Sequence, residues 1–153
     1  MKIALISMEV IPGRPDLNAA AMQKKITDAK AAGADLALFP ALSLSGLFLG
    51  GVWKQPAFLR DYAAYAEEIA AAADGITVVF GNAAAAESCT DVCRTLMEAR
   101  DGVLREVAHS PLHGTGNTFA PLLYELPNEN IILAADVSPF PICFGAGSLA
   151  ETA

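Results

Sequence analysis

Three short apolar runs separated by two helical repeats constrain this chain more than any other feature of its sequence. The runs cover residues 3–8, 36–39 and 76–80, and proline or glycine follows each of them within a few positions. Between the runs, apolar residues recur at three-and-four spacing over residues 19–29 and 58–72, which predicts two amphipathic helices. Alternation of strand and helix is typical of an α/β domain, in which crossover helices cover a sheet.

The second half of the chain predicts antiparallel strands instead. The strand-like runs 95–99 and 103–107 flank the Asp-Gly pair at positions 101 and 102, and this dipeptide favours a tight hairpin. Three more apolar runs follow, at residues 122–126, 131–135 and 140–144. Proline at positions 139 and 141 places the last run at a sheet edge or at a functional strand end.

Length, charge and cysteine content narrow the class of protein. With 153 residues, 54% of them hydrophobic, residues 1–153 are expected to form a single domain with a sizeable core. Seventeen acidic against ten basic residues give a net charge of -7, which argues against nucleic-acid and anionic-membrane partners. No apolar stretch is long enough to span a bilayer. Three cysteines form no even framework, so we expect reduced thiols and a cytoplasmic location.

The segment around the second apolar run is the most specific part of the sequence. Residues 32–40 read AGADLALFP, and Leu42, Ser45 and Gly46 follow. This segment, the opening MKIAL and the helix starting near Asn18 resemble the first strand, helix and second strand of carbon–nitrogen hydrolases of the nitrilase superfamily. Among these, the sequence is most similar to amidases and to the glutaminase domains of NAD synthetases. The resemblance implies a nitrilase-like layered α-β-β-α sandwich, of which this chain would form the N-terminal half.

The same resemblance implies three catalytic positions, and two of them have lost the family residue. In the family the second strand is followed by Phe-Pro-Glu, and the glutamate position is Ala41 here. A family lysine after the hairpin falls near His109 or Ser110, where this chain has no lysine. The family nucleophile lies in an Ile-Cys motif that ends in an acid. Residues 142–145, ICFG, fit this motif with Cys143 as the candidate nucleophile and Gly145 in place of the acid.

Two other interpretations of the cysteine region stay open. A rival alignment based on Asp136 puts Ala134 or Ala135 at the nucleophile position and leaves the chain without a nucleophile. The apolar run before Cys143 favours the first alignment. Even then, an inert cysteine buried in a strand is the commoner situation, and it outweighs the functional interpretation.

The chemistry expected of these residues is weak. A thiol of ordinary pKa needs a neighbouring base or cation to act as a nucleophile at neutral pH, and Ala41 cannot accept a proton. His109 is a weak candidate for a dyad with Cys143, because no third group orients it. His109 and His113 have the spacing of helical metal ligands, but Pro111 favours a loop there. We therefore expect neither a metal nor a cofactor.

Two functions follow from these features. The first is a degenerate carbon–nitrogen hydrolase-like protein with little or no amide hydrolysis that acts as a structural or assembly module. Half a sandwich would leave sheet surface and edges exposed, so self-association, as a homodimer or larger, or a companion chain is expected to cover them. The alternative is a cysteine-dependent amidase or nitrilase-type hydrolase with altered or partner-supplied catalytic groups. A fragment or engineered variant of a longer enzyme is a third possibility.

Overall fold

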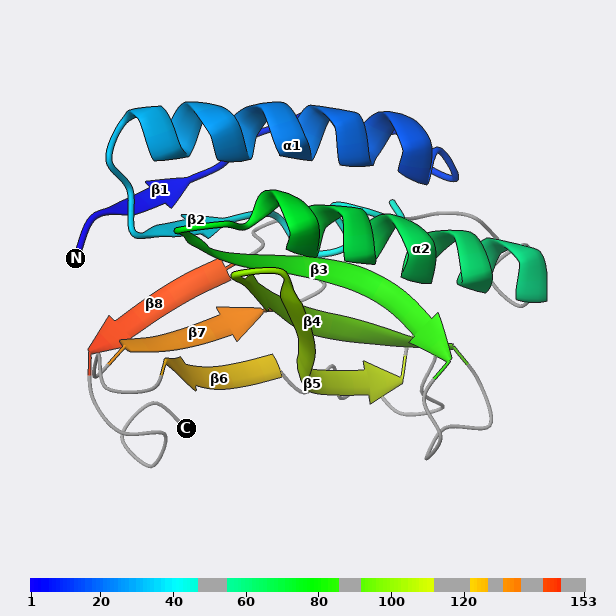
Figure 1. The fold of residues 1–153 in the computed structure, drawn as a ribbon. Coiled ribbons are helices and arrows are strands. Elements are labelled where there is room, and N and C mark those ends of the chain that lie inside the picture. Colours follow the sequence, from blue (N-terminus) through cyan, green and yellow to red (C-terminus); the bar gives the residue numbers. More distant parts are fainter. Residues whose placement is uncertain (47–54, 86–91, 112–121, 127–130, 136–141, 147–153) are drawn as a thin grey trace.

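The computed structural model describes residues 1–46, 55–85, 92–111, 122–126, 131–135 and 142–146, and from residue 110 onward it describes the backbone alone. The first half consists of β1 (Ile3–Leu5), α1 (Pro15–Ala31), β2 (Leu36–Leu38), α2 (Pro56–Ala72) and β3 (Thr77–Ala85) (Figure 1). The second half contains β4 (Val92–Arg100), β5 (Val103–Pro111), β6 (Leu122–Leu126), β7 (Ile131–Ala135) and β8 (Ile142–Ala146). The predicted strand–helix–strand–helix–strand order is confirmed.

Strands β1 to β5 form one mixed sheet in their sequence order. β1, β2 and β3 run parallel, whereas β4 and β5 are antiparallel to their neighbours. The parallel part follows from the two crossover helices, and the antiparallel part follows from the hairpin predicted at the Asp-Gly pair. Asp101 and Gly102 have φ angles of 48° and 78°, the left-handed values of the tight turn that this dipeptide favours.

The last three strands form a second, antiparallel sheet. Its order is β6-β7-β8, so β8 is an outer strand, as the prolines before it predicted. Figure 1 shows α1 and α2 on one side of the five-stranded sheet, with the three-stranded sheet toward the other side. The expected α/β fold, with a sheet covered by helices, is therefore present.

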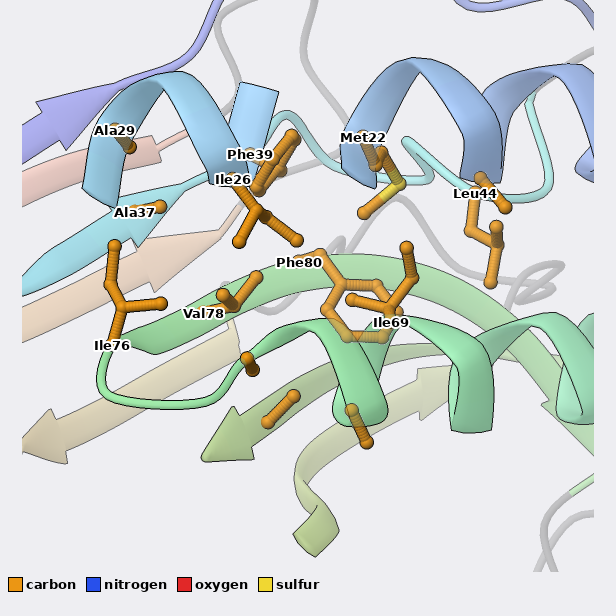
Figure 2. Close-up of a cluster of buried hydrophobic side chains, with 14 of the residues drawn as sticks. Met22, Ile26, Ala29, Ala37, Phe39, Leu44, Ile69, Ile76, Val78 and Phe80 are labelled. Atoms are coloured by element: carbon orange, nitrogen blue, oxygen red, sulfur yellow. The ribbon is translucent and has the colours of Figure 1, made fainter. Parts of the chain in front are cut away.

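The main core fills the space between the two helices and the five-stranded sheet. Met22 and Ile26 of α1 and Ile69 of α2 meet Val78 and Phe80 of β3, and all five side chains are buried (Figure 2). These residues belong to the helical stripes and the strand that the sequence pattern predicted. Burying a large aliphatic side chain contributes roughly 1.5 to 3 kcal/mol, so this layer dominates the stability of the domain.

The opposite face of the same sheet is also apolar. Leu36, Leu38, Val79 and Leu96 form a second buried cluster there. Leu5 of β1 is the register partner of Leu38, yet 65% of its surface is exposed. Among the described strands β1 pairs with β2 alone, so Leu5 is a large exposed residue on an outer strand of the sheet.

Several element boundaries differ from the predictions. The strand expected over residues 3–8 ends at Leu5, and β3 runs on to Ala85 instead of ending at residue 80. The first helix, expected to start near Asn18, starts three residues earlier. The helix begins at Pro15, whose fixed φ suits a first helical position, and it has no side-chain cap. Within the described residues, no helix combines the length and the apolarity needed to cross a bilayer.

Candidate functional site

The loop over residues 40–46 follows β2 at the carboxyl ends of the parallel strands, where α/β folds commonly place their sites. Pro40 cannot continue the ladder, so the chain leaves the sheet there. Phe39 still donates to the carbonyl of Val79 (2.9 Å), and Leu44 donates to that of Gly81 (3.3 Å). Leu42 has a φ of 52°, an uncommon conformation for leucine, and its buried surroundings hold it there. The loop is buried from residue 42 to residue 46.

Gly81 sets the position of residue 41. A Cβ on Gly81 would lie 2.2 Å from the backbone nitrogen of Leu42 and 2.8 Å from the Cα of Ala41. Both contacts are with backbone, so a side chain at position 81 could be accommodated only by moving the loop. The loop therefore lies directly against β3, and Ala41 is half-buried at this contact.

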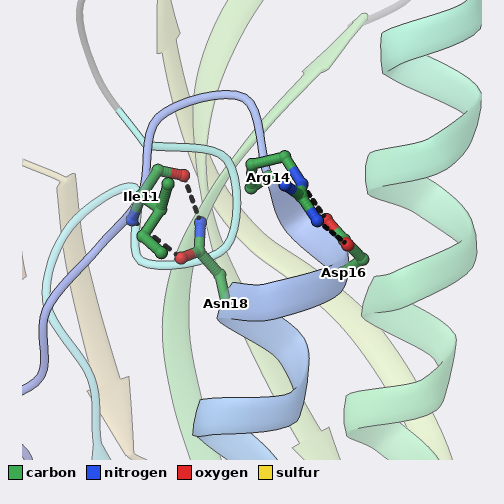
Figure 3. A network of polar contacts seen from close by, with 4 residues as sticks. All are labelled: Ile11, Arg14, Asp16 and Asn18. Atoms are coloured by element: carbon green, nitrogen blue, oxygen red, sulfur yellow. Dashed lines mark hydrogen bonds and ion pairs between the residues drawn. The ribbon is translucent and has the colours of Figure 1, made fainter.

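Asn18 ties the loop to the first helix (Figure 3). Its Oδ1 accepts a hydrogen bond from the backbone nitrogen of Ile11 (2.8 Å), and its Nδ2 donates to the carbonyls of Ile11 and Leu44 (2.9 Å each). Asn18 is 1% exposed, so its amide group is shielded from water, and its bond to Leu44 is fully buried. Gly13 also donates to the carbonyl of Ser45 (3.2 Å). The segment before α1, the helix itself and the loop over residues 40–46 therefore form one connected unit.

An ion pair lies on the surface at the start of the same helix. Arg14 donates from Nε and Nη2 to the two carboxylate oxygens of Asp16, at 2.8 and 2.6 Å (Figure 3). These bonds lower the pKa of Asp16 to about 2. The pair is exposed to water, so it adds little to stability. It lies outside the contact between Gly81 and the loop over residues 40–46.

His109 lies on β5, whereas Ala41 contacts β3. His109 pairs with Thr95 of β4, and Thr95 pairs with Asn82 of β3. Two strand spacings therefore separate His109 from β3, which is roughly 10 Å. Its Nδ1 lies 2.7 Å from Glu106 Oε1, and both side chains are partly exposed. β4 thus lies between His109 and the strand on which Ala41 packs.

Cys143 lies on β8, where its register partner is Ala134 of β7. The two alternative nucleophile positions of the sequence are therefore directly opposite each other on neighbouring strands. Ala135 pairs with Ile142, one step away. The side chain of Cys143 and all of His113 lie outside the described part, so the dyad of Cys143 with His109 stays a prediction. Among the described residues, no group of three or more His, Cys, Asp or Glu could hold a metal ion.

Sequence reasoning missed the residues that hold the site together. The sequence marked Asn18 only as the start of a helix, because its bonds are to chain segments that no local pattern relates to it. Gly81 follows an apolar run, and a glycine in a strand is a signal that another backbone segment approaches closely. The sequence does not show which segment that is. Tyr62 lies in the helical stripe predicted over residues 58–72, and it is fully buried. Burial also raises the pKa of its hydroxyl.

Comparisons with known proteins give a structural likeness without a close sequence relative. No family model matches the chain, and a comparison with curated proteins finds no match. The structure is similar to a glutamine-dependent NAD(+) synthetase from Cytophaga hutchinsonii, with a TM-score of 0.64 and 19% identity over 75% of this chain and 19% of that one. A second such synthetase, from Acinetobacter baumannii, gives a TM-score of 0.58 at 21% identity, over 82% of this chain and 25% of that one.

The structure is also similar to an amidase from Nesterenkonia sp. The TM-score is 0.63 and the identity 21%, over 82% of this chain and 51% of the amidase. The chain thus spans about half the length of the amidase and a smaller part of the synthetases. Another structure of a Nesterenkonia amidase, with a TM-score of 0.62, is described as belonging to the nitrilase superfamily. The described part of this chain therefore has the α/β fold of nitrilase-superfamily carbon–nitrogen hydrolases.

Proposed function

We propose that this chain is a degenerate carbon–nitrogen hydrolase-like domain that does not hydrolyse amides and serves as an assembly module. The observation that carries the proposal is the methyl side chain of Ala41, on a loop that Gly81 and Asn18 hold in place. Residues 40–46 contain no ionisable side chain, so this loop can supply neither a base nor a cation. The scaffold is retained, whereas the group that it would present is absent.

The missing groups have a large expected effect on rate. General-base catalysis and stabilisation of an oxyanion are each typically worth about two to four orders of magnitude. His109 could replace one of these groups only if it reached the site from β5. Its position beyond β4 and its contact with Glu106 argue against that arrangement.

The first test is ammonia release from glutamine, acetamide and acrylamide. We expect the unmodified protein and Cys143→Ala to release ammonia at the same background rate, because no described group activates a thiol. The measurement is a coupled ammonia assay at equal protein concentrations, with circular dichroism to show that both proteins are folded. The matched control is Cys93→Ala, which removes a thiol that is buried in β4.

The alternative function makes the opposite prediction in the same assay. A Nesterenkonia amidase has been observed with acrylamide added to its active-site cysteine. If the alternative holds here, Cys143→Ala will abolish a measurable rate while Cys93→Ala retains it. That result would replace the proposed function with a cysteine-dependent amidase whose other catalytic groups differ from those of the family.

The assembly role rests on the exposed edge of the five-stranded sheet. Among the described strands β1 has a neighbour on one side, and Leu5 leaves 65% of its surface exposed there. An outer strand with a large apolar side chain is a ready template for pairing with another chain. We therefore expect β1 to pair with a second copy or with a companion chain.

Leu5→Lys is expected to shift the protein from dimers or larger species toward monomers. The lysine keeps the side chain long but places a charge where apolar contact would form, which discourages edge-to-edge pairing. Leu17→Lys is the matched control, because Leu17 is also an exposed leucine (42%) but lies on the helix α1 and not on an outer strand. Light scattering coupled to size exclusion gives the masses. A stable monomer before any substitution would count against the assembly role.

A further inference from the structure

A pocket of about 330 Å³ lies between α2 and strands β3, β4 and β5. One wall is the apolar side of α2, with Leu59, Ala63 and Ala66. The facing wall comes from the sheet, where Met97 of β4 and Leu104 of β5 contribute apolar surface. Its volume lies at the lower end of the range of small-molecule sites, and its apolar lining is typical of them. Such a pocket suits a compact apolar molecule.

One polar side chain in the pocket wall has an unpaired hydrogen-bond acceptor. Asn82 of β3 lines it and is 3% exposed. Its Nδ2 donates to the carbonyl of Tyr62 (3.4 Å), but its Oδ1 accepts no hydrogen bond within the described part of the chain. Buried amide oxygens are almost always paired, because an unpaired one loses its hydration without compensation. This oxygen is itself covered, so a ligand with a hydrogen-bond donor would supply the missing partner only after the Asn82 side chain turns toward the pocket.

The pocket is separate from the loop that carries Ala41. Gly81 faces that loop, whereas Asn82, the next residue of β3, lines the pocket. Residues of both faces of β3 line the pocket, and Ala83 among them packs in one buried cluster with Leu42, but no residue of the loop over residues 40–46 is part of the pocket wall. Binding in the pocket therefore does not depend on any catalytic group near Ala41, nor on the proposed function.

We propose that this pocket binds a small, mainly apolar molecule with one hydrogen-bond donor, which the Oδ1 of Asn82 accepts. Apolar surface from Leu59, Ala66 and Met97 provides the bulk of the contact, and the amide oxygen orients the ligand. Arg60 and Glu67 also line the pocket and are exposed, so it opens to solvent beside two charged side chains. Entry therefore does not require the helix to move.

Indole is a suitable probe, because it is compact and carries a single N–H donor. Benzofuran has nearly the same shape but replaces that donor with an acceptor. With the methionine methyl groups labelled with carbon-13, we expect indole to shift the signal of Met97 in a saturable manner and to leave that of Met22 in place. Benzofuran is expected to bind about tenfold more weakly, since one hydrogen bond to a buried acceptor is lost.

Ala63→Leu tests the location. Ala63 is exposed on α2 and lines the pocket, so leucine there should fill the space and weaken indole binding at least tenfold. Ala64→Leu is the matched control, because Ala64 is also an exposed residue of α2 but does not line the pocket. Indole binding to this variant should be unchanged. Ala85→Leu provides a second filling variant on the strand side, should Ala63→Leu fail to fold.

Three results would overturn the proposal. The first is the absence of a saturable Met97 shift with indole up to its solubility limit. Equal affinities for indole and benzofuran would remove the role of Asn82. Unchanged indole binding in the filling variants would place the ligand elsewhere on the protein. Cys143-dependent ammonia release in the assay above would overturn the proposed function but would leave all three measurements unaffected, so the two proposals fail independently.

Discussion

Gly81→Ala is expected to lower the free energy of unfolding by about 3 kcal/mol or more, because its Cβ would make the shortest contact of any described glycine. The added Cβ would lie 2.2 Å from the backbone nitrogen of Leu42 and 2.9 Å from the carbonyl carbon of Ala41. No side-chain rotation relieves a contact between two backbones. Either β3 or the loop over residues 40–46 has to move, and the hydrogen bond from Leu44 to the carbonyl of Gly81 is then strained. Urea denaturation of the purified variant measures the loss.

Gly102→Ala separates this steric effect from the conformational cost of replacing a glycine. Gly102 has a φ of 78°, but a Cβ there would meet nothing within 4 Å. The expected cost is roughly 1 to 2 kcal/mol, which is that of a left-handed conformation for alanine. If Gly81→Ala proved no more destabilising than Gly102→Ala, the close contact between β3 and the loop would be wrong.

Asn18→Ala is expected to cost about 2 to 4 kcal/mol, the second of the two largest effects. The substitution removes three hydrogen bonds and leaves the backbone groups of Ile11 and the carbonyl of Leu44 without them. Each buried group left unpaired costs roughly 1 to 3 kcal/mol, and partial access of water to Ile11 lowers the total. Thermal and urea unfolding, followed by circular dichroism, give the change.

Two further variants make the interpretation of Asn18 specific. Gln23→Ala, on the same helix, removes an exposed amide with one long contact to Glu68 and is expected to change stability by less than about 0.5 kcal/mol. Asn18→Asp keeps the oxygen that accepts from Ile11 but places a second oxygen against two carbonyls. It should therefore be at least as destabilising as alanine at neutral pH. Native stability in Asn18→Asp would show that the two donated bonds are unimportant.

These two residues matter for function because they determine where residue 41 lies. In the proposed function, the scaffold around Ala41 is retained although the residue cannot take a proton. A loop held by Gly81 below and Asn18 beside it would present a carboxylate at position 41 equally well. The proposed loss of activity therefore concerns the chemistry of the side chain and leaves the architecture of the loop intact.

The local elements of this protein were predictable because their signals are local. The stripe of Met22 and Ile26 specifies a helix whichever sheet it packs on, since helical periodicity is a property of one segment. The hairpin at Asp101 and Gly102 was predictable for the same reason, because the turn chemistry resides in the dipeptide itself. Element ends were predicted less well. β1 ends at Leu5 although the apolar run continues, since a strand lasts only as long as its partner β2.

The candidate site was predictable only in part. The position of Ala41 after the second strand followed from a sequence motif, and the structure describes it on the loop beside β3. The relation between Cys143 and Ala134 could not be predicted, because it depends on how β7 and β8 pair. In the sequence, Cys143 and Ala134 are alternative nucleophile positions nine residues apart, whereas in the sheet they are register partners.

The sequence by itself thus determined the alternation of strands and helices, the hairpin and the absence of a carboxylate at position 41. Tertiary structure alone decided that Asn18 binds two separate loops, that Gly81 touches the loop of Ala41 and that Asn82 lines a pocket under α2. The physical reason is the range of the interactions. Periodicity and turn preference act within a few residues of the sequence. A hydrogen bond or a steric contact instead depends on which distant segment of backbone comes within 3 or 4 Å when the chain packs.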